Sequence, residues 1–262
     1  MTRNLRLLAI AWLLNVKQLT RSQFDGFLAI AWPLFFATVA FFMYQAGAKN
    51  ALPLAALGAA VMGIWSAVST SAGSAMQRER WHGTLELLVA APAPFSLVML
   101  PMTIAMSFLG IYSMAATLLW GRLLFGIHVH VDQWPAFLLS VPVTVVSIGL
   151  VGFLMAVAFV RYRAAWALGN LFEYPVWLIC GFLVALSQFP SWVEKIAWLL
   201  PPYWGMNAIR QSAQGDLPGI PDTPLPDAAM CAGLGLVYLA IGILVSDYML
   251  TSARKRATLA LT

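Results

Sequence analysis

Charged side chains in the middle of this chain are concentrated in residues 77–92, which lie between two long apolar runs. Read as an α-helix, this stretch places Glu79, Gly83 and Glu86 on one face at spacings of three and four residues. Leu87 shares this face, whereas Leu85, Leu88 and Val89 lie on a neighbouring apolar face, and Pro92 ends the helix. A helix with these two faces is suited to docking against another molecule in water. The alternative is a solvated loop that carries ordinary anchoring charges.

A second candidate for chemistry is Glu173, a carboxylate inside an otherwise apolar run. An ionised carboxylate in hydrocarbon costs a few kcal/mol, so it must face a partner or a water-filled cavity. Asn170 lies three residues earlier on the same helical face. Two interpretations stay open: a buried, hydrogen-bonded glutamate that fixes helix packing, or a carboxylate that lines a pathway and gates it.

Metal and redox chemistry find little support in the sequence. His128 and His130 precede Asp132 on a short polar segment, but two imidazoles and one carboxylate make an incomplete site. We expect a solvated loop there and no bound metal. Cys180 and Cys231 lie in apolar surroundings without other metal ligands, and we interpret them as free structural thiols.

Composition sets the class of protein that must position these groups. Hydrophobic residues make up 61% of the 262 residues and charged residues 10%, whereas soluble domains carry about 25% charged residues. The chain is therefore expected to be an integral membrane protein. Its formal net charge of +5 does not indicate nucleic-acid binding, because the distribution of charge matters more than its sum in a membrane protein.

The apolar runs predict an all-α fold in a single membrane domain. Each run is free or nearly free of charge and long enough to cross about 30 Å of hydrocarbon. We expect six spans, at residues 26–45, 51–76, 95–120, 134–160, 164–186 and 228–250. In the second span Ala55, Ala59 and Gly63 form a small-residue strip that lets another helix approach closely.

Residues 2–22 have the pattern of an amphipathic helix. Four basic side chains fall within a sector of about 60°: Arg3, Arg6, Lys17 and Arg21. Apolar side chains lie opposite, Trp12 among them, although Ile10 and Leu13 interrupt the basic stripe. We expect this helix to lie flat on the anionic cytoplasmic surface of the membrane, with Trp12 at the depth of the headgroups.

Residues 189–212 predict two short helices rather than a span. Pro190, Pro201 and Pro202 divide them into two apolar-aromatic pieces, each too short to cross a bilayer. We expect both pieces to re-enter the outer leaflet and to leave four aromatic side chains at the interface: Trp192, Trp198, Tyr203 and Trp204.

The basic residues indicate the orientation of the six spans. Eleven of the 15 Lys and Arg residues fall on the side that holds both termini and the 77–92 loop. Four fall on the other side: Lys49, Arg122, Lys195 and Arg210. Basic residues accumulate in cytoplasmic loops, so both termini and the charged loop are expected to be cytoplasmic.

The pattern Glu-Arg-x-x-Gly-Thr-Leu-Glu-Leu-Leu followed by Pro, at residues 79–92, resembles the short cytoplasmic helix of type-2 ATP-binding-cassette (ABC) export permeases. In that family the helix lies between the second and third spans, as here, and docks into a cleft of the ATPase subunit. The resemblance therefore implies a coupling helix at residues 78–92. The residues that it would contribute to coupling are Arg78, Glu79, Arg80, Gly83, Thr84, Leu85, Glu86 and Leu87.

The resemblance also implies partners and a location. Two permease copies would pair, most economically as a homodimer, with two ATPase subunits in the inner (plasma) membrane of a bacterium. The sequence has no Gly-x-x-x-x-Gly-Lys-[Ser/Thr] phosphate loop, so ATP and Mg²⁺ would bind the separate ATPase and no cofactor would bind this chain. The cargo implied is a drug, an antibiotic or a lipid-like molecule.

Three alternatives stay open. A polysaccharide or teichoic-acid exporter would have the same architecture, and the sequence does not separate it from small-molecule efflux. A membrane-embedded lipid-modifying enzyme would need several polar groups converging at the interface, whereas the spans offer Glu173 and, near an end, Asp247. A membrane anchor or sensor would not need the docking pattern.

Overall fold

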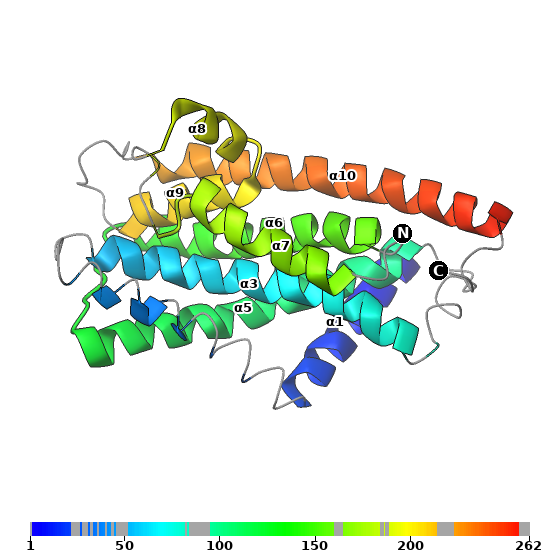
Figure 1. Cartoon of the computed structure of the whole chain (residues 1–262), viewed down its shortest axis with the longest axis horizontal. Helices are drawn as coiled ribbons and strands as arrows, with labels where there is room; N and C mark the ends of the chain where they lie inside the picture. The colour runs from blue at the N-terminus through cyan, green and yellow to red at the C-terminus, as the bar shows by residue number, and fades with distance from the viewer. Residues whose placement is uncertain are drawn as a thin grey trace.

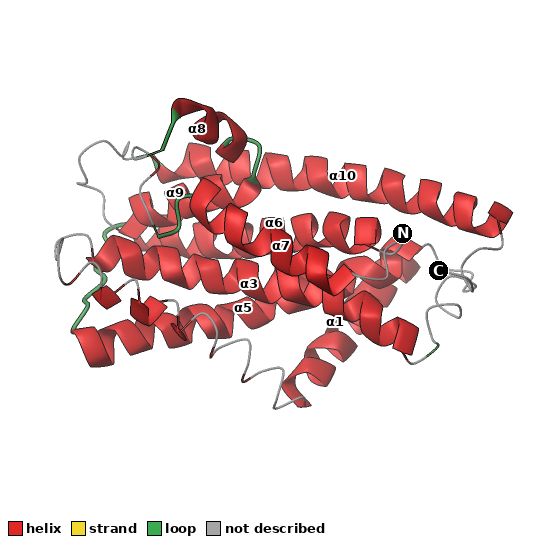
Figure 2. Cartoon of the chain, viewed as in Figure 1, coloured by secondary structure: helices red, strands yellow, loops and turns green. Residues whose placement is uncertain are grey.

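The computed structural model of the chain describes residues 2–21, 27, 31, 34, 35, 37–39, 41, 42, 45, 52–81, 83, 95–159, 165–183, 186, 189–213 and 223–256. These residues are almost all helical, and none of them forms a strand (Figure 2). The all-α class predicted from the apolar runs is therefore confirmed.

Four long helices lie side by side along the longest axis of the molecule (Figure 1). They are α3 (Leu52–Trp81), α5 (Phe95–Phe125), α6 (Trp134–Phe159) and α10 (Pro224–Arg256). Each contains an apolar stretch long enough to cross a membrane: Leu52–Ser69, Ser96–Phe125, Trp134–Ala158 and Pro224–Tyr248. These four helices correspond to the second, third, fourth and sixth predicted spans, and α3, α5 and α10 extend beyond the predicted ends.

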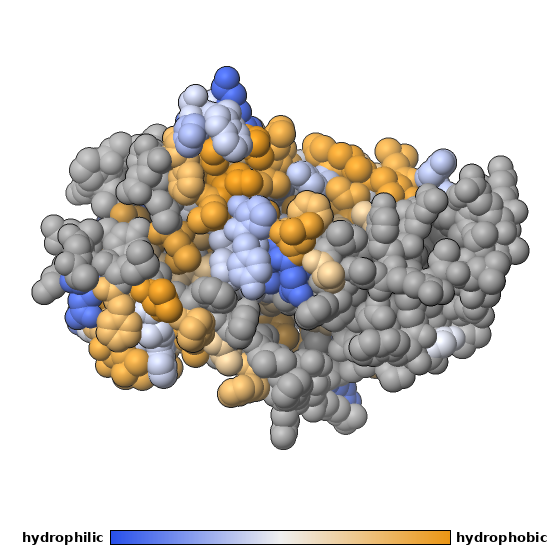
Figure 3. All heavy atoms as spheres, viewed as in Figure 1, coloured by the Kyte–Doolittle hydropathy of each residue, from blue (hydrophilic) through white to orange (hydrophobic). Residues whose placement is uncertain are grey.

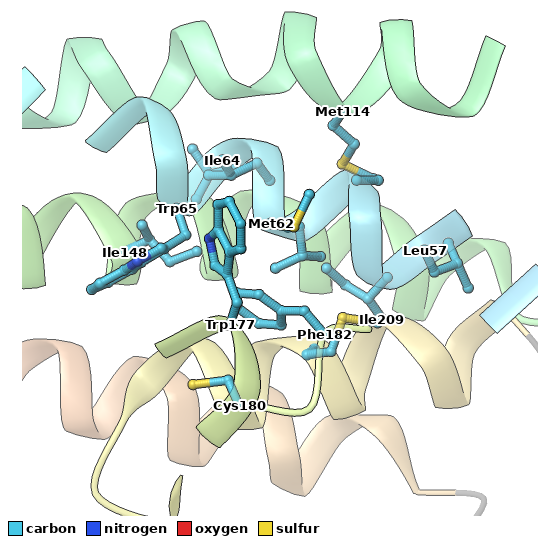
Figure 4. Close-up of a cluster of buried hydrophobic side chains, with 14 of the residues drawn as sticks. Leu57, Met62, Ile64, Trp65, Met114, Ile148, Trp177, Cys180, Phe182 and Ile209 are labelled. Carbon is cyan, nitrogen blue, oxygen red and sulfur yellow. The ribbon is translucent and has the colours of Figure 1, made fainter. Parts of the chain in front are cut away.

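The centre of the bundle is α3, whose side chains from Ala55 to Ser69 are all buried. The small-residue strip lies within this buried part. A Cβ built on Gly110 of α5 would come within 2.6 Å of the Ile64 Cα, so the glycine permits a close α3–α5 approach. Figure 4 shows the core at this level, with Met62 and Trp65 of α3 in one buried cluster with Trp177.

The fifth predicted span is shorter than expected. Helix α7 (Ala165–Ile179) has 15 residues, about 22 Å, which is less than the hydrocarbon thickness. Gly181 has φ 68°; its N–H bonds to the Leu178 carbonyl at 3.1 Å, and the Phe182 N–H bonds to the Trp177 carbonyl at 3.1 Å. These two bonds form a Schellman motif, which ends a helix at a left-handed glycine. The prediction of one helix through residue 186 is wrong.

Two short helices, α8 (Ser191–Ala197) and α9 (Pro201–Ala213), follow where two were expected. They differ in burial. On α8, Trp192 and Ile196 are exposed. By contrast, most of α9 is buried, and it packs between α6 and α10. Tyr203 and Trp204 are half-buried. The sequence predicts both pieces at an exposed interface, but α9 belongs to the bundle interior.

The amino-terminal segment forms α1 (Thr2–Arg21), close to the predicted bounds. In Figure 1 it runs obliquely across the direction of the long helices. Of the first predicted span, only scattered positions between 27 and 45 are described, and all of these are helical. Ala37 and Phe41 are fully buried there and pack against Ala56 and Ala59 of α3.

Candidate functional site

The polar contact that joins α3 and α7 is made by Glu173. The Ser66 Oγ donates a hydrogen bond to Glu173 Oε1, and the two side chains are 5% and 1% exposed. In apolar surroundings a carboxylate is tolerated only where a donor satisfies it. Glu173 has such a donor, and in this conformation it does not line an open cavity. This arrangement favours the packing interpretation over the lining of a pathway.

The remainder of α7 separates into two faces. Val176 and Trp177 lie on the buried face with Glu173. Tyr174 is exposed, and its ring meets that of Trp177 edge to face, with centroids 5.0 Å apart. Asn170 is half-buried, one turn before Glu173. The structure therefore places Glu173 against α3 and Tyr174 on the outward face.

Just beyond the end of α7, three segments meet around one carbonyl group. Arg210 of α9 donates from Nη2 to the Phe182 carbonyl oxygen at 2.9 Å. Beneath it lies Gly58 of α3, where a built Cβ would be 2.6 Å from the Phe182 carbonyl carbon and closer still to its oxygen. A cation at a helix carboxyl end also interacts favourably with the helix dipole. We call Gly58, Phe182 and Arg210 the α7-end cluster.

The other side of α9 is held by polar contacts to α6 and α10. Gln211 Nε2 donates to Asp227 Oδ2 in the first turn of α10, at 2.8 Å. The Gln133 N–H, just before α6, bonds to the Ser212 carbonyl at 3.0 Å. Adjacent residues of α9 thus fasten it to both flanks: Arg210 toward α7 and α3, and Gln211 toward α10.

Both thiols of the chain are buried against α9. The backbone of Tyr203 lies within hydrogen-bonding reach of Cys180, at the end of α7. On α10, Cys231 lies within reach of the Gly205 backbone and of the Thr144 and Ser147 hydroxyls of α6. The two cysteines therefore contact α9 from different helices, and both are free, as predicted.

The predicted coupling segment begins as an extension of α3. This helix continues without a break to Trp81, so the backbone at Arg78, Glu79 and Arg80 is helical. Gly83 is exposed with φ 67°, a conformation that only glycine adopts at little cost. The sequence predicts Gly83 in the middle of a continuous helix. In the structure Gly83 follows a helix end instead. Thr84, Leu85, Glu86 and Leu87 lie outside the described residues.

In the polar segment after α5, His130 Nε2 lies 3.4 Å from Asp132 Oδ1, and both side chains are well exposed. Within the described part of the chain, no three His, Cys, Asp or Glu side chains gather as a metal site would require.

Sequence reasoning missed Ser66, Gly58 and the partners of Arg210. Ser66 is one of many small polar residues in the spans, so nothing marked it as the donor to Glu173. Arg210 is the single charged residue in an otherwise uncharged helix. Its position in the sequence therefore indicates that it needs a polar partner.

Comparison with known protein families assigns the chain to a family. A family model described as ABC-2 type transporter matches residues 7–213, which include most of α1 and all of α3, α5, α6, α7, α8 and α9. A search of curated proteins finds no match. The matched region covers most of the chain and contains both the charged segment and the Glu173 contact. The chain therefore belongs to the ABC-2 type transporter family, as a membrane permease component of a transporter and not itself an enzyme.

Proposed function

We propose that this permease exports a drug, an antibiotic or a lipid-like molecule from a bacterial cell, driven by separate ATPase subunits. In this proposal the pathway forms between two copies of the chain in the inner membrane, and two ATPases bind on the cytoplasmic side, where both termini lie. ATP and Mg²⁺ bind to those ATPases.

The observation that carries the proposal is the continuity of α3. Its 30 residues extend for about 45 Å, roughly 15 Å more than the hydrocarbon is thick. The apolar part ends at Ser69, and the helix then continues to the charged residues 78–80. One helix therefore joins the charged segment to Gly58 and Ser66 in the core. A force applied to the charged end by an ATPase would be transmitted to both.

Motion of α3 would in turn move α7. Ser66 holds Glu173, and Gly58 lies under the Phe182 carbonyl. We propose that the Ser66–Glu173 hydrogen bond maintains the closed arrangement, and that it separates when the pathway opens and exposes Asn170 and Glu173. This proposal gives Glu173 a packing role in the closed state and a gating role in the open state.

The outward faces of α7 and α10 suggest where the second copy binds. On α10, every exposed residue between Ala228 and Ser246 is apolar or glycine, as suits lipid. The exposed face of α7 includes Tyr174, with the half-buried Asn170 beside it. In Figure 3 hydrophilic atoms are visible over α7, while the visible coloured surface of α10 is mostly hydrophobic. Because polar groups in lipid are costly, we propose that the second copy packs against α7.

Two glycines allow a controlled test of coupling. Gly83 and Gly126 follow the ends of α3 and α5, have φ 67° and 63°, and have no neighbour within 4 Å of a built Cβ. A tryptophan at either position therefore carries similar backbone strain. We expect Gly83→Trp to separate ATP hydrolysis from export, or to prevent ATPase assembly, whereas Gly126→Trp retains both. Glu86→Lys should behave as Gly83→Trp does. Normal coupled export by Gly83→Trp and Glu86→Lys would refute the docking proposal.

The proposed pairing can be tested by disulfide crosslinking in membranes. Leu171 of α7 and Leu244 of α10 are exposed to similar extents, 64% and 70%. We expect Leu171→Cys to form crosslinked dimers on oxidation and Leu244→Cys to remain monomeric on a denaturing gel. Efficient crosslinking at Leu244 alone would place the second copy on α10 instead.

A further inference from the structure

Helix α1 binds the bundle through the face that was expected to enter the lipid. Trp12 and Val16 pack against Met102, Ala105 and Met106 of α5. The Trp12 ring also meets that of Phe108 edge to face, with centroids 5.5 Å apart. The apolar stripe recognised in the sequence is therefore occupied by protein, and the opposite face of α1 is directed outward.

The outward face has an apolar middle between two basic ends. Its exposed side chains are Arg6, Leu7, Ala9, Ile10, Leu13, Leu14 and Lys17. Leu13 and Leu14 are 61% and 60% exposed. Arg6 and Lys17 are eleven residues apart, about 16 Å along the helix axis. Large apolar side chains in the middle of a water-facing helix are unfavourable, and cations on a helix buried in hydrocarbon are costly.

The position of α1 along α5 indicates its depth. Arg122 is exposed in the last turn of α5 and cannot lie inside the hydrocarbon. A thickness of about 30 Å corresponds to about 20 helical residues. Counting back from Arg122, the other boundary falls near Met102. Trp12 and Val16 contact α5 between Met102 and Leu109, from this boundary to about 10 Å inside it. This is the depth at which an interfacial helix lies between hydrocarbon and headgroups.

We propose that the outward face of α1 is a binding surface for anionic phospholipids. Leu13 and Leu14 enter the upper part of the acyl layer, while Arg6 and Lys17 bind lipid phosphates on either side. The assignment of this surface to the cytoplasmic leaflet rests on the proposed function and its orientation. The lipid preference itself rests only on the exposure, charge and depth of the face.

The test uses the full chain, labelled with an environment-sensitive fluorophore at Leu13→Cys and reconstituted into phosphatidylcholine vesicles. Cys180 and Cys231 are buried, so the added thiol is the one accessible to the label. Quenching by phosphatidylglycerol with brominated acyl chains is compared with quenching by brominated phosphatidylcholine at the same mole fraction. A label at Leu244→Cys, on the uniformly apolar face of α10, is the control.

We expect the Leu13 label to favour brominated phosphatidylglycerol by a few fold, and at most by about fivefold for each basic side chain. The ratio should fall to about one in an Arg6→Gln/Lys17→Gln variant. For the label at Leu244, the quenching ratio should be about one in every variant. For the label at Leu13, the Lys195→Gln substitution on α8 should leave the ratio unchanged.

Three results would overturn the proposal. One is a Leu13 label that neither lipid quenches, because another protein would then cover the face. The others are equal quenching by the two lipids in the parent chain, and a preference that persists in the Arg6→Gln/Lys17→Gln variant. Export is not measured, so failure here is distinct from failure of the proposed function, which the Gly83→Trp comparison tests.

Discussion

Gly58→Ala tests how closely α3 approaches the turn after α7. The new Cβ would lie 2.6 Å from the Phe182 carbonyl carbon and 2.9 Å from Arg210 Nη2. Ordinary Cβ contacts begin at 3.4 Å, so α3 and the turn would have to separate by at least 0.8 Å. The carbonyl is backbone, held in place by Arg210, and cannot rotate away as a side chain could.

The loss of folding stability in Gly58→Ala depends on how the structure relieves the clash with the new Cβ. Strain from an overpacked interior costs about 1–3 kcal/mol, and loss of the Arg210 hydrogen bond costs about 1.5–3 kcal/mol. Alanine recovers about 1 kcal/mol because it is the better helix former. We therefore expect a net loss of about 1 kcal/mol and at most about 2 kcal/mol, which corresponds to a fall in Tm of about 2–4 °C and at most about 8 °C for a chain of this size.

The assay exploits the buried thiols. A thiol-reactive dye that fluoresces on reaction reports unfolding of the detergent-solubilised protein, because Cys180 and Cys231 become reactive only when exposed. Gly233→Ala on α10 is the matched control, since nothing lies within 4 Å of its built Cβ. That variant should have an unchanged or slightly raised Tm. A Gly58→Ala protein as stable as the Gly233→Ala protein would refute the close contact.

The remaining predictions concern the polar contacts and the orientation. Glu173→Gln retains an acceptor for the Ser66 hydroxyl, so assembly should persist while export rate or substrate preference changes; unchanged export of every substrate would leave Glu173 a packing role alone. Arg210→Met removes the donor to the Phe182 carbonyl and should lower Tm in the dye assay by more than Arg210→Lys does, and equal stability of the two would contradict the α7-end cluster. A cysteine at position 215 should react with an impermeant reagent outside cells, and one at position 82 should not; the reverse result would invert the topology.

The sequence predicted the long helices because uninterrupted apolar runs leave few other structures in a membrane. It did not predict the end of α7, because residues on both sides of Gly181 are apolar. Hydropathy is the same whether a chain continues across the membrane or turns back within the protein. Glycine is also common inside spanning helices, so Gly181 alone did not indicate a turn.

The candidate site was predicted in part for a related reason. A carboxylate in an apolar run must have a partner, and Glu173 does. The identity of that partner required the packing of α3 on α7, since Ser66 is 107 residues away in sequence. For α1, periodicity located the apolar stripe correctly. Whether protein or lipid covers such a stripe depends on what lies beside it, and the local sequence contains no such information.

The two buried thiols beside α9 can also report local opening of the structure. Reagents attack a cysteine only when its sulfur is accessible, so the modification rate of a buried thiol measures how often the surrounding structure opens. Cys180 reports separation of α9 from the end of α7, and Cys231 reports its separation from α6 and α10. If both rates were followed through the ATP cycle by mass spectrometry of intact peptides, the native chain would itself record which side of α9 opens first.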